Sequence, residues 1–205
     1  MRLSFKIISI ILHPVFIPLY LLFIIFSLPV LSIQALNPLM KVVIAGLLAI
    51  NNIIIPIFSF YILKNLSFTK SLQMETAAER KAPYLLGLVY YSITALIFFR
   101  TSYIDELISF IPASVAATIL VLFFINNYIK ISAHMASMGG ALAFFIILHF
   151  YFDINTFFLV IGTTIISGLV ATARLYLKAH TEIEVYSGFI VGFVLTLFAG
   201  YAFLF

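Results

Sequence analysis

Long apolar runs follow one another along almost the whole chain, and only 9% of the 205 residues are charged. A helix rises about 1.5 Å per residue, so a run of about 20 residues can cross the ~30 Å hydrocarbon layer of a bilayer. The runs occupy residues 7–31, 40–63, 84–99, 107–129, 134–151, 156–173 and 184–205. The first, second, fourth and last are long enough to span, whereas 84–99 and 134–151 are short and are expected to be tilted or partly interfacial.

These runs are continuous and do not alternate between apolar and polar residues, which favours helices over the strands of a transmembrane barrel. We therefore predict an all-α fold, a polytopic membrane helical bundle with six or seven transmembrane helices that forms one integral membrane domain over residues 1–205. The first run is too long for a cleavable signal peptide, and Pro14 and Pro18 interrupt it, so a retained span is expected. Because the chain has no cysteine, disulfides and thiolate metal sites are excluded.

The cations are distributed unevenly between the two sides of a seven-span topology. Lys41 and Arg100 fall on one side, and the N-terminal side holds Arg2, Lys6, Lys64, Lys70, Arg80, Lys81, Lys130, Arg174 and Lys178. Because cytoplasmic loops carry the excess of Lys and Arg, the N-terminus is predicted to be cytoplasmic. The same topology places three polar segments together at that face: 64–82, 130–134 and 174–184.

The segment 174–184 carries the densest set of ionisable side chains. Arg174 ends the sixth predicted span, His180 lies in the connection that follows, and Glu184 lies four positions later, about one helical turn away. A carboxylate there can accept the imidazole N–H, which fixes the tautomer and leaves the other ring nitrogen free as a nucleophile or base. Two structural alternatives stay open: Thr181-x-x-Glu184 is also a helix capping box, and Arg174 can serve as an interfacial anchor.

Two further segments supply candidate residues at this face. Ser132 is predicted to cap a span and to place His134 in the first turn, and the alternative is a capped helix start with an interfacial histidine. Arg80 and Lys81 precede the third span, where the alternative is an ordinary cytoplasmic loop followed by a helix that starts at Pro83.

Small and polar residues inside the spans indicate where helices approach one another. Two groups of small residues are expected at close helix contacts: Ser137, Gly139 and Gly140 in one span, and Gly168, Ala171 and Ala173 in the next. His13-Pro14 and Asn51-Asn52 are expected to join helices by hydrogen bonds and freed carbonyls, or to line a cleft through which a lipid reaches the site.

At the candidate residues the chain resembles the type-2 phosphatidic acid phosphatase superfamily, whose motifs run K-x(6)-R-P, P-S-G-H and S-R-x(5)-H-x(3)-D. Ser132-Ala133-His134 is similar to the second motif, with Ala in place of Gly. Ala173-Arg174-x(5)-His180-x(3)-Glu184 is similar to the third, with the spacing intact, Ala for Ser and Glu for Asp. Arg80-Lys81-Ala82-Pro83 keeps the cations and the proline of the first. The similarity covers about residues 75–192, and the chain as a whole looks similar to a divergent bacterial membrane branch of that superfamily.

The resemblance implies a role for each candidate residue. His180 would attack phosphorus and form a phosphohistidine, Glu184 would orient it, and His134 would protonate the leaving group. The phosphate oxygens would be held by Arg174 and Ser132, with help from Arg80 or Lys81. Such a site combines covalent catalysis with charge stabilisation and works without a metal.

The resemblance also implies a lipid-phosphate or isoprenoid-(pyro)phosphate phosphatase of the bacterial cytoplasmic membrane, that is, a phosphoric monoester or diphosphate hydrolase acting on lipids. Two alternatives would use the same residues: a catalytically inactive descendant that binds or transports lipid phosphates, and a lipid phosphotransferase. The expected partners are the bilayer and a membrane lipid phosphate, with no cofactor, no metal and no nucleic acid. The sequence leaves the oligomeric state open.

Overall fold

The computed structural model of the chain describes residues 2–65 and 77–204. Lys70 and residues 75–76 of the predicted motif region lie outside the described residues. Within the described residues every regular element is helical. In chain order these elements are α1 (Arg2–Ile11), α2 (Ile17–Ser27), α3 (Leu31–Gln34), α4 (Pro38–Ala49), the π-helix η1 (Ile50–Ile54), α5 (Ile55–Asn65), α6 (Ala77–Phe99), α7 (Glu106–Ile125), α8 (Ala133–Tyr151), α9 (Phe157–Tyr176) and α10 (Glu182–Leu204).

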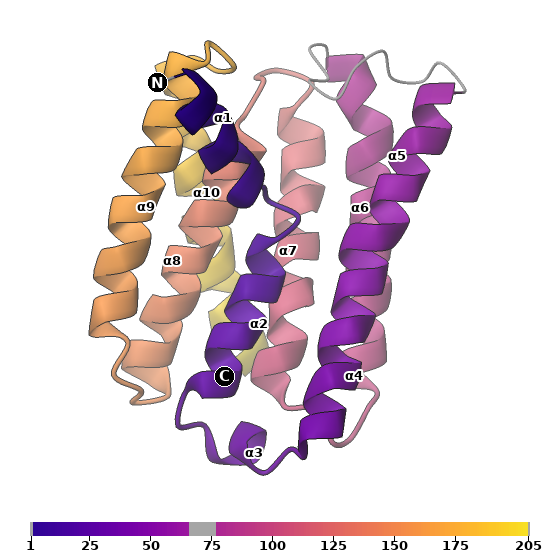
Figure 1. Cartoon of the computed structure of the whole chain (residues 1–205), viewed down its shortest axis with the longest axis vertical. Coiled ribbons are helices and arrows are strands. Elements are labelled where there is room, and N and C mark those ends of the chain that lie inside the picture. Colours follow the sequence, from indigo (N-terminus) through magenta and orange to yellow (C-terminus); the bar gives the residue numbers. More distant parts are fainter. Residues whose placement is uncertain (1, 66–76, 205) are drawn as a thin grey trace.

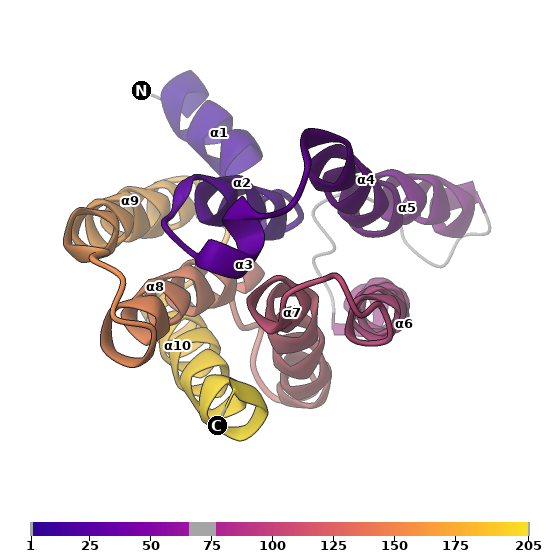
Figure 2. The same cartoon turned by 90° about the horizontal axis from the view of Figure 1, so that it is seen from below.

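The long helices run up and down beside one another and form an all-α polytopic membrane bundle, as the sequence predicts (Figure 1). Seen along the bundle, α4, α5 and α6 lie to one side, α8, α9 and α10 to the other, and α2 and α7 between them (Figure 2). Six stretches of the described chain are long and apolar enough to cross a membrane: Pro38–Asn65, Glu79–Phe99, Glu106–Ile125, Ala133–Tyr151, Phe157–Tyr176 and Glu182–Leu204.

The first apolar run does not form one span, so the prediction of a continuous crossing over 7–31 is wrong. Its residues divide into α1, a break over residues 12–16, and α2. Pro14 explains the break, because it lacks a backbone N–H and disfavours the helical conformation at His13 before it. At 11 residues, α2 rises only about 16 Å, which is too short to cross. Instead, α1 and α2 follow one another along the length of the bundle (Figure 1).

The two runs that the sequence predicts to be marginal both form full-length helices. The described part of α6 is 23 residues long and contains Pro83, so the alternative of a helix that starts at this proline is wrong, and Arg80 and Lys81 lie within the helix and not before it. Helix α8 has 19 residues and is the most buried of the six spans, so it is central and not interfacial. The bounds of α8 match the predicted run within one residue, whereas hydropathy underestimates α6, because it scores side chains and a helix closes its backbone hydrogen bonds over polar residues such as Arg80 as well.

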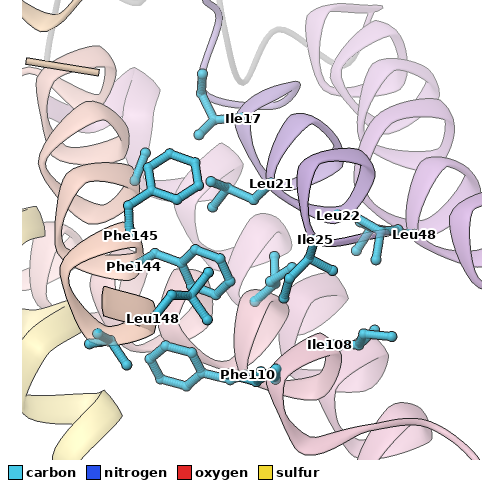
Figure 3. Packing of buried hydrophobic residues seen from close by; sticks show 14 of the residues in the cluster. Ile17, Leu21, Leu22, Ile25, Leu48, Ile108, Phe110, Phe144, Phe145 and Leu148 are labelled. Atoms are coloured by element: carbon cyan, nitrogen blue, oxygen red, sulfur yellow. The ribbon is translucent and has the colours of Figure 1, made fainter. Parts of the chain in front are cut away.

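Buried aliphatic and aromatic side chains fill the middle of the bundle (Figure 3). Leu22 and Ile25 of α2 are fully buried there, which ties this short helix to its neighbours. The Phe144 ring of α8 stacks on Phe110 of α7, with ring centroids 6.2 Å apart. Because lipid tails are as apolar as these side chains, close packing is what favours this arrangement in a bilayer.

Helices α8 and α10 pack backbone to backbone through glycines. A Cβ added at Gly192 would overlap the carbonyl oxygen of Ala136, and one added at Gly139 would overlap that of Phe189. The expected close contact at Gly139 is therefore confirmed. Gly168 has open space where a side chain would lie, so the expected close contact at that residue is wrong. The close approach of α8 to α10 sets the first turns of both helices side by side.

The π-helix η1 turns a polar side chain toward a neighbouring helix. Asn52 is buried, and its Nδ2 donates to Oγ1 of Thr94 on α6 at 3.3 Å. About two turns after Asn52, the hydroxyls of Ser59 and of Tyr90 on α6 are 2.6 Å apart. Such hydrogen bonds between helices stabilise membrane bundles, and the interhelical interpretation of Asn52 is confirmed.

Candidate functional site

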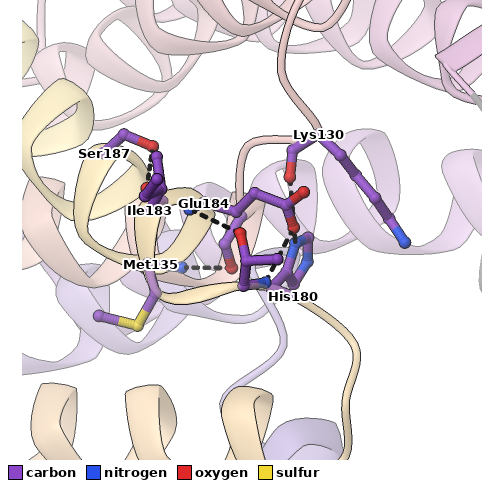
Figure 4. Close-up of polar contacts among 8 residues, drawn as sticks. Lys130, Met135, His180, Ile183, Glu184 and Ser187 are labelled. Carbon is purple, nitrogen blue, oxygen red and sulfur yellow. Dashed lines mark hydrogen bonds and ion pairs between the residues drawn. The ribbon is translucent and has the colours of Figure 1, made fainter.

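Predicted polar segments meet at the end of the bundle that carries the N-terminus (Figures 1 and 4). The Ser132 backbone N–H donates to the carbonyl oxygen of Glu184 at 3.0 Å. The Nδ1 atom of His180 is 3.1 Å from the carbonyl oxygen of Lys130. Helix α6 begins at the same end (Figure 1), and Arg80 is the fourth residue of this helix. The described parts of the three segments thus share one face, as the seven-pass topology predicts.

His180 is fixed by the carboxylate of Glu184. The distance from Nδ1 to Oε2 is 2.8 Å, and the same nitrogen faces the Lys130 carbonyl (Figure 4). Both partners are acceptors, so Nδ1 carries the hydrogen and the neutral ring leaves Nε2 with a free lone pair. The carboxylate also accepts from the Thr181 N–H at 3.2 Å, while the Glu184 N–H donates to Oγ1 of Thr181 at 3.4 Å. The capping box and the imidazole contact, two alternatives in the sequence, therefore exist together.

The surroundings of His180 favour its neutral form. Burial lowers the pKa of the imidazole most strongly, and the Arg174 guanidinium lowers it further. The hydrogen bond to Glu184 acts in the opposite direction, and the net result is a pKa below the ordinary value. At neutral pH the ring is thus uncharged, which is the state that a nucleophile requires.

His134 lies in the first turn of α8 and faces the N-terminal segment. Its Nε2 is 3.0 Å from the backbone carbonyl oxygen of Ser9 on α1. A carbonyl only accepts, so Nε2 carries a hydrogen and Nδ1 is the ring atom left for proton transfer. The His13 ring meets the His134 ring edge to face, with centroids 5.1 Å apart.

The sequence did not identify His13 or Ser9 as candidate site residues. His13 was predicted to join helices or to line a cleft, and Ser9 carried no signal of its own. The helix break at Pro14 brings His13 against α8. The proline that follows His13 was the one feature of the sequence that could have indicated this contact. Burial and the charge of Arg174 lower the pKa of His13, so this ring is also neutral at neutral pH.

Two guanidinium groups supply positive charge to the cluster. Arg174, in the last turn of α9, is close enough to His13, His134 and His180 for its charge to act on each ring. Its charge also interacts with that of Arg80, which is 7% exposed. Two cations close to each other, one of them buried, favour an anion between them.

Of the two remaining predicted residues, Ser132 lies at the edge of the cluster and Lys81 lies at the surface. The Ser132 hydroxyl accepts from the Met135 N–H at 3.5 Å, which confirms it as the cap of α8, and its side chain is fully buried. Lys81 is exposed on α6, and within the described residues it makes no hydrogen bond or ion pair to the cluster. The structure therefore brings five candidates together, with Ser132 adjacent: Arg80, His134, Arg174, His180 and Glu184.

Within the described residues, no group of three or more His, Cys, Asp or Glu side chains is arranged to hold a metal ion. Comparisons of the chain with models of protein families, with curated proteins and with solved structures gave no match. The function is therefore argued from the residues of this chain.

Proposed function

We propose that the protein is a lipid-phosphate or isoprenoid-(pyro)phosphate phosphatase that uses a histidine nucleophile and no metal. The observation that carries this proposal is the 2.8 Å contact between His180 Nδ1 and Glu184, which leaves Nε2 free within reach of the Arg174 charge. The motif spacing shared with the type-2 phosphatidic acid phosphatase superfamily supports the same chemistry. A site at one end of a membrane bundle favours a substrate that is itself anchored in the bilayer.

In the first step, Nε2 of His180 attacks the terminal phosphorus, and the bond between phosphorus and the leaving oxygen breaks. The bound phosphate anion favours the charged form of His134, which then carries a hydrogen on Nδ1 as well and gives it to that oxygen. Arg174 and Arg80 stabilise the charge on the non-bridging oxygens, with help from the Ser132 segment at the start of α8. In the second step, water attacks the phosphohistidine, its proton passes to His134, and inorganic phosphate leaves. Glu184 holds the imidazole in one tautomer throughout.

The charge distribution supports a cytoplasmic site in the bacterial inner membrane. Lys41, in the first turn of α4, and Arg100, directly after α6, lie toward the end of the bundle away from the site (Figure 1). The other described cations belong to the site end: Arg2, Lys6, Lys64, Arg80, Lys81, Lys130, Arg174 and Lys178. By the positive-inside rule, the N-terminus and the site then face the cytoplasm.

The test is phosphate release by the purified full-length protein, with a chelator present, from micelles of phosphatidic acid and of an isoprenyl diphosphate. His180→Ala is expected to abolish release, and His149→Ala, a histidine at the opposite end of α8, is the matched control. Equal turnover by wild type and His180→Ala would refute the assignment of the nucleophile.

Two other outcomes identify the alternatives. Transfer of phosphate to an added lipid alcohol, with loss in His180→Ala, would make the protein a lipid phosphotransferase. Binding of lipid phosphates without turnover of any of them would make it a binding or transport protein.

A further inference from the structure

Two buried polar atoms in the corner between α1, α8 and α9 have no hydrogen-bond partner among the described residues. They are Oγ of Ser9 and Nε of Arg174. Ser9 is 7% exposed and is the one buried residue that α1 contributes. Its carbonyl oxygen is 3.0 Å from His134, which places the residue at the site. A buried donor without an acceptor is unfavourable, and a bound ligand with acceptor oxygens removes the penalty.

His13 adds a third donor in the same corner. Its Nδ1 accepts from the Val15 N–H at 3.4 Å, so the neutral ring carries its hydrogen on Nε2. The ring meets His134 edge to face, and it lies within range of the Arg174 charge. Ser9, His13 and Arg174 can thus all donate hydrogen bonds next to the imidazole that protonates the leaving group.

We infer that Ser9, His13 and Arg174 form a second phosphoryl-binding subsite on the leaving-group side, so that the substrate is a lipid diphosphate. This inference rests on the proposed phosphatase function and narrows it. The leaving group of a lipid monophosphate is an alcohol, which offers no charge to three donors. The leaving group of a diphosphate is a lipid phosphate, whose oxygens accept charge-assisted hydrogen bonds from all three.

The reaction then follows the two steps proposed above with the atoms assigned. The terminal phosphoryl group is transferred to Nε2 of His180 as its bond to the bridging oxygen breaks. The bridging oxygen leaves as part of the lipid monophosphate and receives the proton of His134. Water then hydrolyses the phosphohistidine, so that diphosphate and water give lipid monophosphate and inorganic phosphate.

The test compares two substrates with the same lipid, an isoprenyl diphosphate and the isoprenyl monophosphate. Ser9→Ala removes the unpartnered hydroxyl but keeps the carbonyl that binds His134, and His13→Gln removes the imidazole. We expect the loss of kcat/KM in each variant to be about tenfold or more larger for the diphosphate than for the monophosphate. Thr172→Ala, which removes an exposed hydroxyl on α9, is the control.

Equal loss for both substrates, or no loss for either, would overturn the subsite while leaving the phosphatase proposal intact. A binding measurement decides the case in which wild type turns over neither substrate. Inorganic pyrophosphate and inorganic phosphate are added to the detergent-solubilised full chain, and thermal stabilisation is recorded. Stronger stabilisation by pyrophosphate that is lost in Ser9→Ala supports the subsite even without turnover, and equal stabilisation of wild type by both anions rejects it.

Discussion

At the residue scale, one carboxylate oxygen connects the fold to the proposed chemistry. Oε2 of Glu184 accepts from His180 Nδ1 and from the Thr181 backbone N–H. The first bond sets the tautomer of the imidazole, and the second completes the N-terminus of α10. The glutamate therefore acts through His180 as a positioning residue, and it also stabilises the helix that carries it.

Glu184→Gln separates these two effects. The amide oxygen can still cap α10, but the negative charge that orients and polarises His180 is lost. We expect kcat for phosphate release to fall by about 100-fold or more, while the thermal midpoint changes by only a few degrees. Steady-state kinetics and thermal unfolding of the purified protein measure both quantities. Unchanged kcat would show that Glu184 serves only the helix cap.

At the element scale, the contact between α8 and α10 determines where His134 and His180 lie relative to each other. Each histidine lies at or just before the start of one of these helices. Gly139 and Gly192 let the backbones touch, so the geometry of the site depends on residues without side chains that lie about two to three turns into the helices.

Gly192→Ala is expected to disturb both stability and activity. The added methyl group would overlap the Ala136 carbonyl, and relief requires the helices to move apart. Overpacking of this kind costs about 1–3 kcal/mol, and the shift separates the two histidines. Gly46→Ala is the matched control, since nothing lies within 4 Å of the added methyl there. Thermal midpoint and phosphate release are measured in parallel, and equal behaviour of the two variants would contradict the prediction.

At the scale of the whole molecule, the uneven placement of cations predicts a single orientation in the membrane. The chain has no cysteine, so single cysteines report accessibility without background. Lys178→Cys is exposed at the site end, and Asp153→Cys is exposed at the opposite end. In intact cells, we expect a membrane-impermeant maleimide to label Asp153→Cys at once and Lys178→Cys only after permeabilisation. The reverse pattern would place the site outside the cytoplasm.

The stability of the molecule is expected to depend on pH through its buried histidines. The pKa values of His13 and His180 are lowered in the folded protein, whereas the unfolded chain binds protons near the ordinary value of about 6.5. Below that pH the unfolded state therefore holds more protons than the folded state, and stability falls as pH falls. The thermal midpoint should decline below about pH 6.5, and the decline should be shallower in His13→Gln/His180→Gln. An identical slope in the double variant would contradict this origin.

The sequence by itself determined the all-helical class and the alternating direction of successive helices across the membrane. It also determined that the segments around His134, His180 and Arg80 lie at the same membrane face. It could do so because a bilayer forces each apolar run to be helical and each polar connection to lie at a membrane surface. The contact of His180 with Glu184 also followed from local spacing, since four residues make about one helical turn.

Only the tertiary structure decided which elements touch. In the structure the first apolar run is divided at Pro14, and Ser9 and His13 lie against His134. Helix α8 is the central span, and Gly192 makes a close helix contact that Gly168 lacks. These features depend on which face of each helix meets which neighbour. In a chain that is apolar all round, hydropathy does not mark one face as inward, so packing between small residues and hydrogen bonds between distant polar groups makes that choice.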